Sequence, residues 1–151
     1  MKALIQKVSK ASVEVKGKIV GEINRGILVF LGMEKGDNDK DISYIVDKTV
    51  NLRIFESDAG KLDYSVTDKE GELLIVSQFT LCADCRNGRR PDFGSAAPPK
   101  EALEIYEKTL NLFKATGLKT QSGQFRAYMQ ITLINDGPVT ILIESPKKYD
   151  K

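Results

Sequence analysis

The 151-residue sequence contains no histidine. This absence excludes a serine–histidine–aspartate triad, a cysteine–histidine pair, a histidine-ligated zinc ion and an imidazole general base. If the chain is a hydrolase, its proton transfers must use another group, or the substrate must supply one. The lack of histidine therefore restricts the possible chemistry before any motif is considered.

The sequence also has no run approaching the roughly 18 consecutive apolar residues of a membrane span. Its first residues, Met1–Lys7, become polar again quickly and lack the apolar region of a signal peptide. The net charge of +2 is too balanced to indicate a nucleic-acid binder, so an RNA site would need local clustering of basic residues. We expect a cytoplasmic protein without a membrane partner, folded as one domain over residues 1–151.

Only two cysteines are present, Cys82 and Cys85, in a C-x-x-C spacing. Such pairs occur in redox motifs and in zinc sites. A redox pair normally lies where a strand turns into a helix, but here the polar stretch Arg86–Arg90 follows. A zinc ion would need two further ligands, and the chain has no other cysteine or histidine. We interpret the thiols as incidental and expect no metal or cofactor, with a small redox or metal protein as the alternative.

Hydrophobic periodicity predicts many strands and two helices. We expect strands at residues 3–8, 11–16, 19–23, 27–31, 73–76, 127–133 and 139–144, and a strand–turn–strand at 53–70. We expect turns at 17–18, 58–60 and 135–138, a loop at 83–97 and a loosely held tail at 147–151. The runs 27–31 and 73–76 are typical of strands buried on both faces, whereas the alternation in 127–133 predicts one buried face.

The first helix is expected to open at Gly36–Asp39, whose Asp and Asn side chains can cap free N–H groups, and to end near Leu52. The second is expected to start at Pro98-Pro99 and to stop at Gly117. Its predicted apolar face consists of Ala102, Leu103, Tyr106, Leu110 and Phe113. Two helices among many strands, without regular βαβ alternation, indicate an α+β fold.

The segment Asn135-Asp136-Gly137-Pro138 lies between two predicted strands. Asp-Gly alone is an ordinary hairpin signal. The proline is unusual there because it cannot donate a hydrogen bond to a strand ladder. A glycine before proline relieves the steric restriction on that position and leaves the backbone open to a ligand. From the residues alone, a plain turn and a ligand-binding turn both remain open.

The segment Ser77-Gln78-Phe79-Thr80 follows the second buried strand directly. Ends of core strands are rigid and commonly carry sites. Thr80 is a candidate nucleophile, although no histidine is present to activate it. The alternative is that these polar groups only satisfy nearby backbone. The basic cluster of Arg86, Arg89 and Arg90 is either a phosphate contact or a solvated loop.

Taken together, these segments resemble the D-aminoacyl-tRNA deacylase family over essentially the whole chain. The matching segments are Ala3–Val8, Ala11–Val13, Asn51–Phe55, Val76–Leu81, Arg90–Phe93, Ala96–Pro98, Gly123–Phe125, Met129–Gln130 and Asn135–Thr140. The resemblance implies a curled, mostly antiparallel, barrel-like sheet with two main helices packed on it. It also implies hydrolysis of the ester that joins a D-amino acid, or wrongly attached glycine, to tRNA, while L-aminoacyl-tRNA is left intact.

The resemblance further implies a homodimer with its pocket at the subunit interface, aminoacyl-tRNA as the partner, and neither DNA nor a cofactor. Gly137-Pro138 matches a cis dipeptide that reaches into the other subunit's pocket and rejects L side chains. The candidate catalytic residues are Ser77, Gln78 and Thr80, and the candidate pocket-lining residues are Phe79, Phe125 and Met129.

The mechanism has two readings. Either Thr80 is the nucleophile, or the 2′-hydroxyl of the terminal ribose assists attack by water while backbone groups hold the oxyanion. The lack of histidine favours the second.

Two positions depart from the family pattern. Lys7 stands where an arginine is common, at a position thought to brace the Gly-Pro turn. Arg126 stands where glycine or alanine is typical. A nucleic-acid-binding module that has lost activity is the main rival interpretation.

Overall fold

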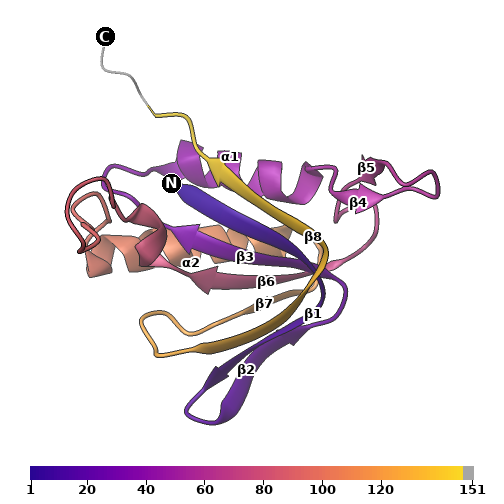
Figure 1. The fold of residues 1–151 in the computed structure, drawn as a ribbon, viewed down its shortest axis with the longest axis horizontal. Coiled ribbons are helices and arrows are strands. Elements are labelled where there is room, and N and C mark those ends of the chain that lie inside the picture. The colour runs from indigo at the N-terminus through magenta and orange to yellow at the C-terminus, as the bar shows by residue number, and fades with distance from the viewer. Residues whose placement is uncertain (148–151) are drawn as a thin grey trace.

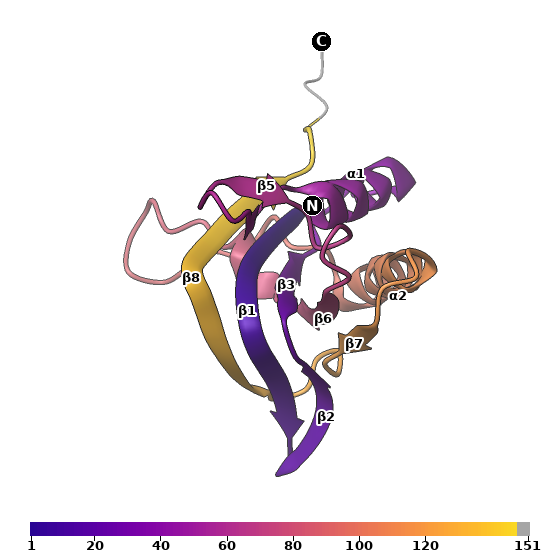
Figure 2. The same cartoon turned by 90° about the vertical axis from the view of Figure 1, so that its right-hand side faces the viewer.

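The chain forms a sheet that bends almost into a barrel, with two helices on one of its faces (Figures 1 and 2). The computed structural model describes residues 1–147. Its strands are β1 (Lys2–Val15), β2 (Lys18–Ile23), β3 (Gly26–Gly32), β4 (Phe55–Glu56), β5 (Leu62–Tyr64), β6 (Glu72–Ser77), β7 (Thr120–Ser122) and β8 (Gln130–Glu144). Its helices are α1 (Asp39–Asn51), the short 3-10 helix η1 (Phe79–Cys82) and α2 (Pro99–Ala115). The predicted α+β class with two main helices is confirmed.

The long strand β1 organises the sheet. It pairs antiparallel with β2, β3 and β8, and the sheet continues through two parallel pairs, β3–β6 and β6–β7. The far strands β2 and β7 approach each other closely. A Cβ at Gly21 would lie 2.6 Å from the backbone oxygen of Ser122, so this contact requires glycine. The sheet is therefore mostly antiparallel and nearly closed, as expected.

Two layers of apolar side chains lie on the two faces of the sheet. In β3, Ile27, Val29 and Leu31 face the helices, while Leu28 and Phe30 face the inside of the bend. The strand is therefore buried on both faces, as predicted, which explains why residues 27–31 are continuously apolar rather than alternating. The helix-side layer is the larger one and holds both helices against the sheet.

Both helices begin and end close to the predicted positions. The Asn38 side chain accepts a hydrogen bond from Lys40 N, and the Asp41 side chain accepts one from Asn38 N, which forms a capping box for α1. The buried positions of α2 are Ala102, Ile105, Tyr106, Thr109 and Phe113. The prediction that Leu103 lies on the buried face is wrong. Leu103 is exposed, whereas Ile105 and Thr109 face the core. None of the described helices is long and apolar enough to cross a membrane.

The N-terminal half corrects two expectations. The strands predicted at 3–8 and 11–16 form one strand, β1, because a bulge interrupts the side-chain pattern without ending the pairing. Val8 lies opposite Asn135 and Lys10 opposite Ile134, so two steps on β1 match one on β8. The turn after β1 is at Lys16–Gly17, one residue earlier than predicted, and both residues have positive φ.

The C-terminal third departs further from expectation. The chain turns at Phe125–Arg126, where Ala127 N donates to Gln124 O, so the strand predicted from residue 127 begins only at Gln130. Its inward residues Ile131 and Leu133 are half-buried rather than buried. The sequence pattern predicts no strand at the position of β7. Of the tail predicted to be loosely held, residues 148–151 lie outside the described part of the chain.

The predicted hairpin at residues 135–138 is wrong. β8 runs through this segment and pairs antiparallel with β1 on both sides of it. Asn135 lies opposite Val8 and Thr140 opposite Gln6, so the four residues Asp136–Val139 leave the ladder as a bulge loop. A local pattern of strand, Asn-Asp-Gly-Pro and strand is the same for a hairpin and a bulge loop. Only the shared partner strand distinguishes them.

The α-amino group of Met1 is buried at the start of β1. It lies 2.9 Å from Glu34 Oε2 and 2.7 Å from Asp37 Oδ1, and it donates to Ser145 Oγ. Burial alone would lower the pKa of the amine, but hydrogen bonds and charge from Asp37 and Glu34 outweigh it, so the pKa is raised. Burial raises the pKa of the Asp37 carboxyl. This cluster connects β1 to the segment after β8.

Candidate active site

The first signature segment, Ser77–Thr80, lies where β6 ends. Ser77 is the last residue of β6 and pairs with Leu31 of β3. Gln78 N then donates to the backbone oxygen of Leu31 at 2.7 Å, and the chain enters η1. Main-chain hydrogen bonds to a buried neighbouring strand therefore hold this segment.

Within this segment, the Gln78 amide donates a hydrogen bond to Thr80 Oγ1. Thr80 is exposed and Gln78 is half-buried, so both groups can be reached from solvent. An amide is far too weak a base to remove a hydroxyl proton in either of its orientations. The local geometry thus offers Thr80 a hydrogen-bond partner but no general base.

An aromatic pair lies beside Thr80. Phe79 is 57% exposed, and its ring meets that of Phe93 edge to face, with centroids 5.0 Å apart. Phe93 belongs to the loop after η1, which Asp84 and Asp92 close through two reciprocal backbone hydrogen bonds. A large ring exposed at a strand end is accessible to an apolar or aromatic ligand.

The predicted basic cluster is divided. Arg86 forms a forked contact with Asp84, with its closest nitrogen 2.6 Å from the carboxylate, and this lowers the pKa of Asp84 to about 2. Arg89 and Arg90 are exposed, and neither forms an ion pair within residues 1–147. Two of the three arginines therefore remain available to an anion.

Phe125 and Met129 lie on different sides of the chain between β7 and β8. Phe125 stacks on Tyr106 of α2, with centroids 5.6 Å apart. Burial raises the pKa of Tyr106 to about 12, and its hydroxyl donates to Ile75 O. Met129 packs over Gly123, where a Cβ would lie 2.8 Å from the methionine sulfur. The structure packs these two predicted pocket residues against different apolar layers, Phe125 on the helix side and Met129 inside the bend.

The second signature segment is the bulge loop, Asp136–Val139, with its flanking residues. The Gly137-Pro138 peptide bond is cis, as the resemblance implies. Gly137 has φ +140°, and a Cβ there would lie 3.0 Å from Val139 Cγ2, so the position needs glycine. Asp136, Gly137 and Pro138 are all exposed.

Side chains close the bulge loop at its base. Asn135 Oδ1 accepts from Val139 N at 3.2 Å, and Asn135 Nδ2 donates to Thr140 Oγ1 at 2.9 Å. Gln6 Nε2 donates to the same hydroxyl oxygen at 3.1 Å. The sequence interpretation assigned no role to these three residues. Asn135 and Thr140 bound the motif, so their polar types were the available signal.

The two signature segments lie at opposite ends of β3. Ser77 is opposite Leu31 at the end of that strand, whereas Asn135 is opposite Val8, which pairs with Gly26 at its start. Strands rise about 3.3 Å per residue, so the two ends are roughly 16 Å apart. One chain therefore does not bring Gly137-Pro138 to Thr80.

Lys7 is buried beneath the bulge loop. Its Nζ lies 5.5 Å from the centroid of the Phe55 ring, and the Arg25 guanidinium lies 5.3 Å from the same ring. No hydrogen bond joins the Lys7 side chain to the bulge loop among the described residues. Within one chain, contact with an aromatic ring accounts for this lysine.

Both cysteines are free thiols. Cys82 is buried and donates to the backbone oxygen of Met33, whereas Cys85 is exposed. Burial raises the pKa of the Cys82 thiol, which disfavours the reactive thiolate. Across residues 1–147 no three metal-ligating side chains gather.

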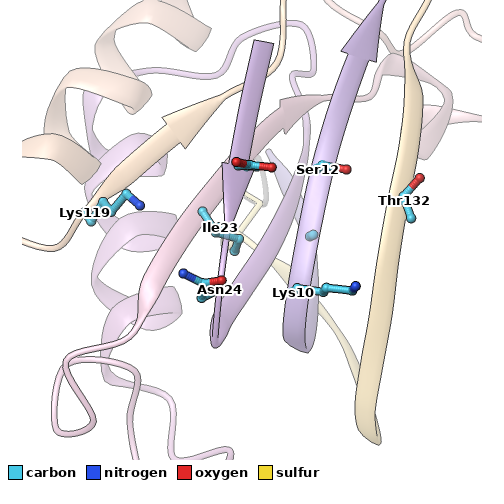
Figure 3. Close-up of a pocket in the computed structure, with 8 residues that line it drawn as sticks. Lys10, Ser12, Ile23, Asn24, Lys119 and Thr132 are labelled. Carbon is cyan, nitrogen blue, oxygen red and sulfur yellow. The ribbon is translucent and has the colours of Figure 1, made fainter. Parts of the chain in front are cut away.

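A shallow pocket of about 300 Å³ lies elsewhere, against β1, β2 and β8 (Figure 3). Its lining residues are Lys10, Ala11, Ser12, Glu22, Ile23, Asn24, Lys119 and Thr132. None of the predicted site residues lines it. The pocket has two cationic side chains, Lys10 and Lys119. Lys119 Nζ lies 3.5 Å from Glu72 Oε1, so this cation already has a partner.

Known proteins match this chain over almost its full length. A family model described as D-Tyr-tRNA(Tyr) deacylase matches residues 4–144. Proteins named D-aminoacyl-tRNA deacylase from Thermosipho africanus and Natranaerobius thermophilus are 52% and 54% identical, each covering 99% of this chain and 100% of the relative.

Two solved structures are also similar. One, named c-Myc DNA Unwinding Element Binding Protein, has a TM-score of 0.92 at 44% identity and covers 97% of this chain and 100% of its own. The other is described as a probable eukaryotic D-amino acid tRNA deacylase. It has a TM-score of 0.83 at 16% identity, covers 95% of this chain and 98% of its own, and shows the fold alone.

Proposed function

The chain belongs to the D-Tyr-tRNA(Tyr) deacylase family, and we propose that it hydrolyses the ester bond of D-aminoacyl-tRNA in a pocket completed by a second copy of itself. The observation that carries this proposal is the separation of Ser77–Thr80 from Gly137-Pro138 within one chain. In a twofold dimer each chain supplies one segment to each of two equivalent sites. Residues 1–151 act in this proposal as one catalytic domain in the cytoplasm.

The face of the sheet that the helices leave uncovered supports a dimer. Leu142, Leu4 and Phe30 pair across β8, β1 and β3 and point to the same side. Leu142 is 51% exposed, and the other two are half-buried. A row of apolar side chains that is partly open to solvent is typical of an interface. This row lies between the two signature segments, where a second copy would bring its own bulge loop.

Selection between D and L substrates would then work by exclusion. The partner's bulge loop would present the backbone of Gly137 and Pro138 to the α-carbon of the bound amino acid. An L side chain would collide with that backbone, whereas the hydrogen of a D-amino acid or of glycine would fit. Exclusion by main-chain atoms suits a motif of one glycine, which has no side chain, and one proline, whose ring fixes φ.

The reaction would use the substrate's own hydroxyl group. Thr80 has a hydrogen-bond donor beside it and no base, so the 2′-hydroxyl of the terminal ribose would assist attack by water. Backbone N–H groups of the first signature segment would stabilise the oxyanion. Gln78 and Thr80 would position the ester, and the exposed Phe79 ring would contact the terminal adenine.

Hydrolysis of D-tyrosyl-tRNA, L-tyrosyl-tRNA and glycyl-tRNA side by side tests this function. We expect hydrolysis of the first and third substrates and none of the second, with the activity unaffected by excess duplex DNA. Equal rates on D- and L-tyrosyl-tRNA would contradict the selection mechanism. Tight tRNA binding without hydrolysis of any substrate would favour the rival view of an inactive binding module.

A further inference from the structure

The β7–β8 loop, Gly123–Met129, leaves the sheet beside the first signature segment. β7 runs parallel to β6 with Ser122 opposite Ile75, and Gly123 N donates to Ile75 O. The loop therefore emerges at the end of the sheet where β6 reaches Ser77. Figure 1 shows it at the left edge of the sheet, on the same side as the loop that follows η1.

The inner side of this loop is anchored. Phe125 stacks on the buried Tyr106, and Met129 packs over Gly123. Ala127 N donates to Gln124 O across the turn. These contacts fix the loop backbone from below, so the positions from which the outward side chains project are set before any ligand arrives.

The outer side of the loop carries Arg126 and Tyr128. Tyr128 is 88% exposed, and Arg126 is exposed at φ +60°. No ion pair involves Arg126 in the part of the chain that the structure describes. A solvent-exposed aromatic ring on an anchored loop, two residues from an unpaired guanidinium, has the chemistry of a single-stranded RNA contact: the ring stacks on a base and the cation meets a phosphate.

We propose that Arg126 and Tyr128 bind the unpaired nucleotides that precede the terminal adenosine of the tRNA. This inference rests on the proposed function, because Ser77–Thr80 would hold the ester and the adenosine next to this loop. Local charge agrees with a polyanion: in the loop that follows η1, at the same end of the sheet, Arg86 and Asp84 pair with each other, which leaves Arg89 and Arg90 against Asp92. Tyr128 would set affinity for the tRNA end and take no part in ester cleavage.

Kinetics on two substrates test the proposal. D-tyrosyl-tRNA carries the preceding nucleotides, whereas D-tyrosyl-adenosine has the same ester without them. For Tyr128→Ala we expect KM for D-tyrosyl-tRNA to rise roughly tenfold, because base–aromatic stacking is lost, with kcat unchanged. Kinetics on D-tyrosyl-adenosine should stay unchanged, and Tyr128→Phe should behave like the unaltered protein on both substrates.

Two further measurements complete the test. Arg126→Gln should reduce the slope of log affinity for tRNA against log salt by about one. Tyr64→Ala is a matched control, because Tyr64 is an exposed tyrosine on β5, which lies at the opposite end of the molecule from the β7–β8 loop in Figure 1. In a direct binding assay, Tyr128→Ala should lower the affinity for intact tRNA roughly tenfold. It should leave unchanged the affinity for tRNA trimmed of its 3′ nucleotides.

The outcomes separate the two proposals. A parallel loss on D-tyrosyl-tRNA and D-tyrosyl-adenosine, no loss on either, or a changed elution volume of Tyr128→Ala in gel filtration would overturn the role of this loop. If the unaltered protein cleaves no D-aminoacyl-tRNA, the proposed function fails, while the binding measurement with intact and trimmed tRNA still decides the role of Tyr128.

Discussion

Ser77–Thr80 and the bulge loop Asp136–Val139 lie at opposite ends of the same sheet, and different contacts hold them. The first is fixed by main-chain hydrogen bonds that continue the pairing of β6 with β3. The second has left its ladder, and the side chains of Asn135, Thr140 and Gln6 close its base. The end proposed for ester binding should therefore tolerate side-chain changes better than the end proposed for selection.

The largest expected effect is at Gly137. Alanine there would bring a Cβ to 3.0 Å from Val139 Cγ2 at a φ that L side chains rarely adopt, so the loop must shift. We expect kcat/KM for D-tyrosyl-tRNA to fall on the order of 100-fold, the usual effect of a misplaced site element. Gly60→Ala is the control, because Gly60 also has positive φ but no atom within 4 Å of its Cβ position. Equal activities of the two variants would contradict a special requirement for glycine at position 137.

The next effect concerns the base of the bulge loop. Thr140→Val keeps the side-chain shape and removes the hydroxyl that accepts from Asn135 and Gln6. Loss of two hydrogen bonds should loosen the loop and reduce the ratio of D- to L-tyrosyl-tRNA hydrolysis about tenfold. Thr132→Val, at an exposed position in the first half of β8, should leave the ratio unchanged. An unchanged ratio in Thr140→Val would mean that side chains do not hold the loop.

A smaller effect is expected at the other end. Thr80→Ala removes the hydroxyl that receives the Gln78 amide hydrogen bond. If the ribose hydroxyl assists the reaction, single-turnover hydrolysis should fall less than about tenfold. Circular dichroism and tRNA binding check that the variant is folded and competent. Complete loss of hydrolysis in a folded, tRNA-binding variant would identify Thr80 as the nucleophile.

The smallest effect involves neither segment. The folded pKa of the Met1 amine is raised above 8.0, so its contribution to stability is present below about pH 8 and is lost as the pH rises through the raised pKa. We expect the free energy of unfolding to decrease above pH 8. Asp37→Asn should flatten this decrease and leave the D-to-L ratio at pH 7 unchanged. A pH-independent stability would contradict this contribution of the Met1 amine, and a changed ratio would connect the cluster to the site.

Much of the fold was predictable because local signals determine it. Asn38 caps the first helix through its own side chain, and Pro99 opens the second, so both helix starts could be read from single residues. The doubly buried strands β3 and β6 were visible as continuous apolar runs. The location of Ser77–Thr80 at a strand end followed directly from β6.

The remainder depended on contacts between segments distant in sequence. The bulge loop was predicted as a hairpin, because only pairing of both halves of β8 with β1 distinguishes the two. The strand predicted from residue 127 failed because Arg126 adopts a positive φ, which its side chain does not signal. The distance between the two signature segments required the register of β1 against both neighbours.

Mixed dimers test the central claim, that each site is shared between two copies, most directly. Gly137→Ala leaves the first signature segment intact, and Phe79→Asp leaves the bulge loop intact while placing a negative charge at an exposed position facing an anionic substrate. Each variant alone should be nearly inactive. After unfolding and refolding together in equal amounts, half of the dimers should contain one fully unaltered site, and the account predicts recovery of about one quarter of the original D-tyrosyl-tRNA activity. No recovery in verified mixed dimers would contradict a shared site.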